Sequence, residues 1–244
     1  MAAPGRRSSA LKLIVSPILF LITVGLVIQS VSALASFAQT ADTRDLAASI
    51  EKGFKPDIGY LSRFVRDNGF DRSPNDCGDA ITRARLTVGL AALQTASAGN
   101  DVEMIDAAER NALEIARHRL TCNPLDGNAW LGLAVIETQS SGPAPTTIDA
   151  LRLSYWAAPN EGWVMEARLP FATRLYLAGV AGFESEYLDD LRRFADYEPI
   201  NQVAATYIDI DARIQALLHP MIASQPEARK KAIVAEIDRL GLRF

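Results

Sequence analysis

The chain has 244 residues, 49% of them apolar, which is enough to bury one sizeable core and still supply a membrane segment. The formal net charge is −4, and the cations Arg6, Arg7 and Lys12 precede the first apolar run, so the remainder of the chain sums to −7. Acidic and basic residues are interleaved in that remainder. This pattern excludes general nucleic-acid binding, which needs clustered Lys and Arg against the phosphates.

The first predicted element is a membrane-spanning helix at residues 13–35. These 23 residues are nearly all apolar and carry no charge, and a helix of that length crosses a hydrocarbon core of about 30 Å. The basic segment 1–12 and the acidic remainder place the N-terminus in the cytoplasm by the positive-inside rule. We therefore expect a single-pass bacterial inner-membrane protein with one soluble domain in the periplasm.

The same apolar segment also fits a cleavable signal peptide. Ala33-Leu34-Ala35 and Ser36-Phe37-Ala38 both have the small-x-small form that signal peptidase prefers. The apolar run is longer than the usual h-region of about 7–15 residues, which favours an uncleaved anchor. Either alternative exports the domain that follows.

Beyond residue 41 the apolar residues recur at helical spacing, and no stretch alternates as a half-buried strand does. The predicted fold class is therefore all-α. Gly, Pro, Asn and Ser clusters at 98–100, 123–127 and 140–143 separate the helices. The expected helices in chain order include two capping helices within the 36–76 segment, at 43–52 and 57–68, and then helices at 82–93, 104–120 and 162–177 and one after Pro226. Pro170 predicts a kink or a break in the 162–177 helix.

Prolines in similar turns, Pro124, Pro159 and Pro199, suggest a repeat, because they lie 35 and 40 residues apart. At the first turn, Pro124 is followed by Trp130 and Leu133 at the separations used by the tetratricopeptide repeat (TPR) family, which residues 77–215 therefore resemble. Departures from the family pattern are Ala134, which stands for the usual Gly, and Glu137, which stands for the usual aromatic.

The resemblance implies stacked helix pairs with a concave surface made of the first helix of each pair. Stacking is required because one helix pair cannot bury its apolar face alone. Residues 216–244 are expected to form a C-terminal capping helix, with Ile233 and Ile237 on its buried face.

Two cysteines, Cys77 and Cys122, flank the two helices expected around 79–93 and 104–120. In an antiparallel hairpin the start of one helix and the end of the next are neighbours, and an exported domain permits oxidation, so we predict a disulfide. The alternative is two separate buried thiols. We expect no metal site, since neither cysteine has a CxxC partner and only two histidines are present.

Catalytic motifs of the GxSxG, HExxH, P-loop and GxGxxG types do not occur in the sequence. Both His118 and His219 lie at expected helix ends, where a solvated or boundary role is ordinary. Acidic pairs such as Asp189-Asp190 point in different directions on a helix and indicate surface charge. We expect no enzyme activity, no catalytic residue and no cofactor.

The densest candidate binding segment is the turn after residue 155. Two tryptophans with amide, carboxylate and guanidinium groups close by can stack on a sugar ring or hold a peptide. The alternative is that both tryptophans pack between repeats. The candidate residues are Trp156, Asn160, Glu161, Trp163, Glu166 and Arg168.

These features predict a non-enzymatic interaction protein that binds a protein partner in an envelope complex. The alternative is an accessory factor in cell-surface polysaccharide production or export that contacts glycan, because the layout of a signal anchor, a cysteine-bearing helical domain and an Ala-Pro-Asn-Glu turn is similar to small proteins of exopolysaccharide assembly. The Arg-rich, Lys-poor composition and the export-compatible layout indicate a Gram-negative bacterium.

Overall fold

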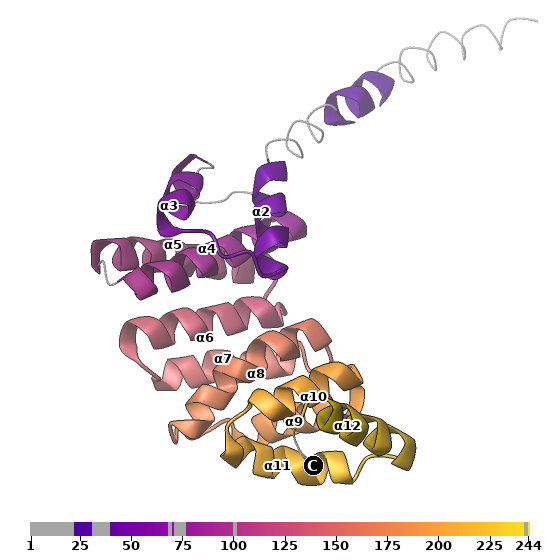
Figure 1. Ribbon diagram of the computed structural model, residues 1–244. Coiled ribbons are helices and arrows are strands. Elements are labelled where there is room, and N and C mark those ends of the chain that lie inside the picture. The colour runs from indigo at the N-terminus through magenta and orange to yellow at the C-terminus, as the bar shows by residue number, and fades with distance from the viewer. Residues whose placement is uncertain (1–21, 31–39, 68–69, 71–76, 100–101, 242–243) are drawn as a thin grey trace, which may run out of the picture.

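The computed structural model describes residues 22–30, 40–67, 70, 77–99, 102–241 and 244. Over these ranges the chain folds into helices joined by short turns and contains no strand, which confirms the predicted all-α class (Figure 1). The helices are α2 (Ala41–Glu51), α3 (Ile58–Asp67), α4 (Asp79–Gly99), α5 (Val102–Cys122), α6 (Gly127–Ser141), α7 (Pro145–Ala157), α8 (Gly162–Leu177), α9 (Glu184–Tyr197), α10 (Ile200–Asp209), α11 (Ala212–Ala223) and α12 (Glu227–Arg239).

The expected membrane anchor at 13–35 lies mostly outside the described residues, as does the basic segment 1–12. Of the anchor, only residues 22–30 are described, and they form an exposed helical stretch that precedes α2 in Figure 1. None of the helices that the structure describes combines the length and the apolar content needed to span a membrane.

Successive helix pairs stack along the domain. The α4 helix packs against α5, α6 against α7, and α8 against α9, while α6 also contacts α4, α5 and α8. Small residues allow these close approaches, since a Cβ added at Gly132 of α6 would lie 3.3 Å from the Leu86 side chain of α4. The result is one continuous apolar core shared by neighbouring pairs.

Local signals in the sequence set the ends of α6 and α7. The Asp126 carboxylate accepts a hydrogen bond from the Ala129 amide at 2.9 Å and so caps the start of α6. Gly142, with φ of 74°, ends the same helix in a conformation that favours glycine. Pro145 then begins α7, where its missing N–H costs nothing.

The two ends of the stack differ from its middle. At the N-terminal end, α2 and α3 both pack on α4, in the positions expected of capping helices. At the C-terminal end, α10 packs mainly on α12 and α11 packs on α9. The expected boundary after residue 215 lies within α11, and residues 216–244 contain the rest of α11 together with α12. Ile233 and Ile237 are buried on α12 as predicted.

Pro170 does not break α8, which runs unbroken from Gly162 to Leu177. The proline removes the amide that would bond to the Glu166 carbonyl. Both Pro170 and Glu166 are exposed. Water can therefore satisfy that carbonyl, which removes most of the cost of a proline inside a helix.

The Cys77–Cys122 disulfide is present, with a Cα–Cα distance of 5.4 Å, and it joins the start of α4 to the end of α5. This confirms the prediction made from the positions of the cysteines. Beside it the buried Arg119 donates to the Thr82 hydroxyl at 2.6 Å and pairs with Asp126. The disulfide and the buried ion pair together connect α4, α5 and the cap of α6.

Candidate functional site

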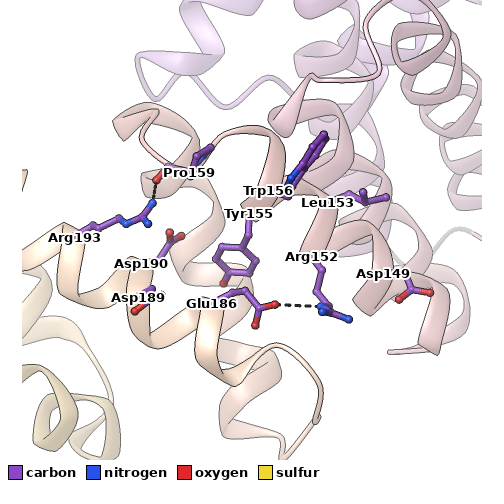
Figure 2. Close-up of a pocket in the computed structure, with 10 residues that line it drawn as sticks. All are labelled: Asp149, Arg152, Leu153, Tyr155, Trp156, Pro159, Glu186, Asp189, Asp190 and Arg193. Carbon is purple, nitrogen blue, oxygen red and sulfur yellow. Dashed lines mark hydrogen bonds and ion pairs between the residues drawn. The ribbon is translucent and has the colours of Figure 1, made fainter.

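One candidate site is a cleft between α7 and α9, closed at one end by the turn that joins α7 to α8. Its volume is about 620 Å³, and we call it the α7–α9 cleft. Figure 2 shows side chains from both helices facing this space. The lining residues are Asp149, Arg152, Leu153, Tyr155, Trp156, Pro159, Glu186, Asp189, Asp190 and Arg193.

The cleft lies between the second helices of neighbouring pairs, not on the surface formed by the first helices. Within α7, Asp149, Arg152, Leu153 and Trp156 recur at helical spacing and share one face. The opposite face of α7 is buried in the core through Ala150, Leu151 and other residues. Periodicity therefore divides α7 into a core side and a cleft side.

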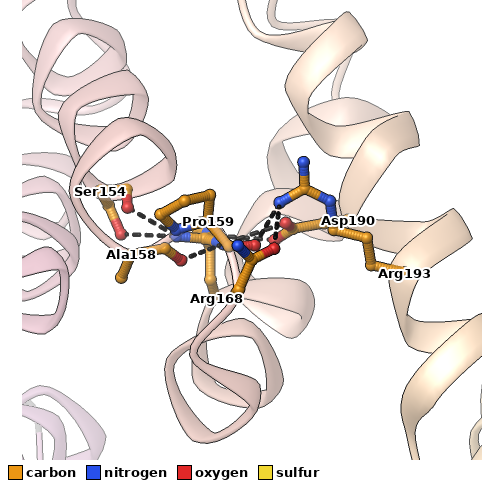
Figure 3. Close-up of polar contacts among 7 residues, drawn as sticks. Ser154, Ala158, Pro159, Arg168, Asp190 and Arg193 are labelled. Carbon is orange, nitrogen blue, oxygen red and sulfur yellow. Dashed lines mark hydrogen bonds and ion pairs between the residues drawn. The ribbon is translucent and has the colours of Figure 1, made fainter.

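A buried ion pair between Arg168 of α8 and Asp190 of α9 lies beneath the cleft. The Arg168 side chain is 0% exposed and Asp190 is 2% exposed. Two hydrogen bonds join them, from Arg168 Nε to Asp190 Oδ2 at 2.8 Å and from Nη2 to Oδ1 at 3.0 Å (Figure 3). Burial raises the pKa of the Asp190 carboxyl, while the hydrogen bonds from Arg168 oppose that rise.

Arg168 also holds the end of α7. Its Nη1 donates to the Ser154 carbonyl at 2.8 Å, and its Nη2 donates to the Ala158 carbonyl at 3.4 Å. The expectation that Arg168 contacts a ligand is therefore wrong, because every donor direction is used inside the protein. Asp190, expected at the surface, is instead buried as the counter-charge of Arg168.

Tyr155 forms the floor of the cleft above this pair. The Arg168 guanidinium lies 4.1 Å from the centre of the Tyr155 ring, a cation–π contact. The tyrosine is 6% exposed, and its hydroxyl has no hydrogen-bond partner among the described residues. Burial and the charge of Asp190 raise the pKa of Tyr155, so the hydroxyl keeps its proton and is available as a donor.

The rim of the cleft carries an exposed aromatic ring and several charges. Trp156 is 68% exposed, and Figure 2 shows its indole beside Leu153 at the mouth of the cleft. Arg152 of α7 bonds to the Glu186 carboxylate of α9 at 3.1 Å and bridges the two walls. At the other end, Arg193 of α9 donates to the carbonyl of Pro159.

Two arginines hold the turn between α7 and α8: Arg168 donates to the Ala158 carbonyl, and Arg193 donates to the Pro159 carbonyl. Arg193 donates also to the Asn160 side-chain oxygen at 3.2 Å. A smaller cleft of about 380 Å³ lies on the far side of the turn and is lined partly by Asn160 and Tyr197. The turn therefore lies between two clefts. Asn160 helps to hold it there through its hydrogen bond with Arg193, which lies 33 positions later in the chain.

Trp163 lies apart from the α7–α9 cleft. The Arg83 guanidinium of α4 is 4.0 Å from the centre of its ring, and Trp163 is 41% exposed. The contact links first helices two pairs apart, so the alternative of a tryptophan that packs between repeats fits Trp163. The same alternative fails for Trp156, whose ring is largely exposed.

The two predicted glutamates are exposed and do not line the α7–α9 cleft. Glu161 ends the turn, and its carbonyl accepts from the Val164 and Met165 amides at the start of α8. Glu166 lies next to Glu198. Burial, followed by the hydrogen bond and like charge of Glu166, raises the pKa of Glu198.

Sequence analysis missed the acids and arginines of the cleft walls. Those on α7 carried a signal, since Asp149, Arg152 and Trp156 occur at the spacing of one helix face. Glu186 and Arg193 on α9 could not be recognised from the sequence, because no local pattern indicates that α9 lies opposite α7.

His219, expected at a helix boundary, lies in the last turns of α11 and bonds to the Tyr207 hydroxyl at 3.1 Å.

One group of possible metal ligands occurs among the described residues. The donor atoms of Cys77, His118 and Cys122 lie within 4.8 Å of one another. The two sulfur atoms are bonded to each other, however, so this group offers no thiolate to a metal ion. His118 is therefore a neighbour of the disulfide.

Comparison with known proteins identifies no relative of this chain. No family model matches it, and no match was found among the curated proteins or the solved structures. The stacked helix pairs and the α7–α9 cleft are therefore the features from which a function can be inferred.

Proposed function

We propose that this protein is a membrane-tethered interaction protein whose helical stack binds a protein partner on the periplasmic side of a bacterial inner membrane. The observation that carries the proposal is Trp156. Its ring is largely exposed at the mouth of a cleft of about 620 Å³. A tryptophan beside an arginine is typical of the residues that dominate binding energy at protein interfaces.

The arrangement of the helices supports a TPR-like stack. The first helix α4 contacts its own second helix α5 and the next first helix α6, and α6 likewise contacts α7 and α8. At the Pro124 turn, where the sequence resembles the TPR family, Trp130 Nε1 donates to the Pro124 carbonyl at 2.8 Å and ties the turn to α6. Stacks of this kind present extended surfaces to partners.

Export and tethering are supported by separate features. A disulfide between two helices is typical of proteins in an oxidising compartment. The apolar segment 13–35 has the length and lack of charge of a signal anchor. We infer that residues 1–12 stay in the cytoplasm and that the helical stack stands outside the membrane.

Co-purification of the full-length chain from membranes in mild detergent tests the proposal. The wild-type protein should bring down one partner in constant ratio, and Trp156→Ala should lose it. Trp163→Ala is the matched control, because it removes an exposed tryptophan outside the cleft and should retain the partner. A wild-type chain that is recovered alone contradicts the proposal.

A second candidate function, an accessory factor of cell-surface polysaccharide production, is favoured by the chemistry of the cleft walls. Carboxylates, guanidinium groups and an exposed indole lie together there, a combination suited to sugar hydroxyls and ring faces. Deleting the gene should reduce surface polysaccharide, and the wild-type gene should restore it. Unchanged polysaccharide in the deletion strain contradicts this candidate.

A further inference from the structure

The charges around the α7–α9 cleft are close to balance. Three of its acids each have an arginine partner: Glu186 with Arg152 at 3.1 Å, Asp189 with Arg192 at 2.6 Å, and Asp190 with Arg168 at 2.8 Å. The two lining charges that remain are of opposite sign, Asp149 and Arg193. A cleft with this balance has no strong field of one sign and does not select a polyanion or a polycation.

Hydrogen-bonding capacity nevertheless remains in the walls. Ion-paired carboxylates keep free lone pairs, and the Arg152 contact to Glu186 uses only one of its five N–H groups. The Tyr155 hydroxyl is a buried donor with no acceptor among the described residues, and such a group is satisfied by an ordered water or by a ligand that displaces it. In Figure 2 the Tyr155 side chain extends from α7 toward Glu186 and the acids of α9.

The exposed indole of Trp156 completes the set. An aromatic face carries partial negative charge and attracts the partly positive C–H groups of a sugar ring. The volume, about 620 Å³, lies within the range of small-molecule sites. A neutral, ring-shaped ligand rich in hydroxyl groups uses all three properties: the balanced charge, the spare hydrogen bonds and the aromatic face.

We propose that the α7–α9 cleft binds a neutral saccharide. One pyranose ring packs on Trp156, and its hydroxyl groups bond to Asp149, Arg152 and the Tyr155 hydroxyl. The inference rests on the second proposed function, under which Trp156 and the cleft hold a glycan in place of a protein partner, and it names the ligand class of that site. An acidic glycan is disfavoured, because Asp149 adds a negative charge to the lining and the charge of Arg152 is already balanced by Glu186.

Ligand-observed saturation-transfer NMR on the full-length chain tests this proposal. The protein is kept in a detergent without a sugar head group, since a maltoside would compete. The neutral probes are trimers of glucose, galactose, mannose and N-acetylglucosamine, and the charged probes are trigalacturonate and a lysine-rich peptide. We expect at least one neutral trimer to bind, and trigalacturonate and the peptide to bind at least about tenfold more weakly.

Three variants then locate the site. Trp156→Ala should weaken binding by about tenfold or more, and Trp163→Ala should leave it within about twofold. Tyr155→Phe, which removes only the hydroxyl, should weaken saccharide binding by several fold while leaving the thermal midpoint of the free protein unchanged or higher. Circular dichroism of each variant shows whether it is folded. Affinity should change less than about twofold between 50 and 500 mM NaCl, because no net charge is neutralised.

Several results would overturn the proposal. These are the absence of binding by every neutral trimer, wild-type affinity in Trp156→Ala, and preference for trigalacturonate or for the peptide. Wild-type affinity in Tyr155→Phe removes that hydroxyl from the site and overturns the proposed geometry. Loss of surface polysaccharide on deletion together with no saccharide binding would refute this inference and leave the second proposed function standing.

Discussion

Replacing Asp190 with alanine should destabilise the protein by about 3–5 kcal/mol, because it leaves the Arg168 guanidinium buried without a counter-charge. Arg168 is 0% exposed and loses two charge-assisted hydrogen bonds, at 2.8 and 3.0 Å, in this variant. Its bonds to the Ser154 and Ala158 carbonyls remain, but neutral acceptors do not replace the lost charge. For a chain of this size the thermal midpoint should fall by roughly 6–20 °C.

Urea unfolding of the full-length chain, followed by its helical circular dichroism, measures this change. Asp189→Ala is the matched control, since the neighbouring acid pairs with Arg192 at 2.6 Å but both side chains are more than half exposed. An exposed pair contributes about 0–1 kcal/mol. The double variant Arg168→Met with Asp190→Leu should be more stable than Asp190→Ala, because no buried charge is left unpaired. A loss below about 1 kcal/mol for Asp190→Ala, equal to that of the control, would refute this reasoning.

Three further predictions concern other parts of the fold. Gly127→Ala should cost about 1–3 kcal/mol in a urea titration, because its Cβ would clash with that of Ala158; a neutral result would show that the turn can shift. The pKa of Glu198 is raised in the folded protein, so folding loses stability as the pH rises and the Glu198 carboxyl ionises. Glu166→Gln removes the neighbouring like charge and should therefore raise the free energy of unfolding by about 0.2–1 kcal/mol at pH 7. At pH 4 the two proteins should unfold alike, and an equal gain there would contradict the like-charge explanation. Cys77→Ser should cost about 4 kcal/mol, given the separation of 45 residues along the chain, and a thiol assay on unreduced wild type should find no free thiol.

Helix positions follow closely from local pattern. The predicted capping helices at 43–52 and 57–68 correspond to α2 and α3, within two residues at each end. The predicted helix at 104–120 is α5, which extends two residues further in both directions. Apolar spacing and turn residues are properties of neighbouring positions, so the chain carries this information without reference to its tertiary contacts.

The candidate site follows from the sequence only in part. The concentration of aromatic and polar residues after residue 155 predicted a binding segment there, and Trp156 of that segment lies at the mouth of the α7–α9 cleft. Asn160, however, bonds to Arg193 across 33 positions of sequence. Such a partner depends on which helices lie side by side, and no local pattern specifies that.

Buried charge is the clearest failure of composition-based reasoning. Arg168 was expected to contact a ligand and Asp190 to lie at the surface, because ionised side chains are almost never fully buried unless they are paired. In this fold Arg168 and Asp190 are buried as a pair that joins α8 to α9, and the buried Arg119 pairs with Asp126 and bonds to Thr82 of α4. Only after the helices pack do the counter-charges come within bonding distance.

The sequence by itself determined the helical class and the disulfide, because both depend on spacing along the chain and on one short hairpin. Tertiary structure decided which face of each helix is covered. It separated Trp156, exposed at the α7–α9 cleft, from Trp163, which stacks with Arg83. Periodicity defines the faces of a helix, but the neighbour that covers one face or leaves it open is set by long-range packing.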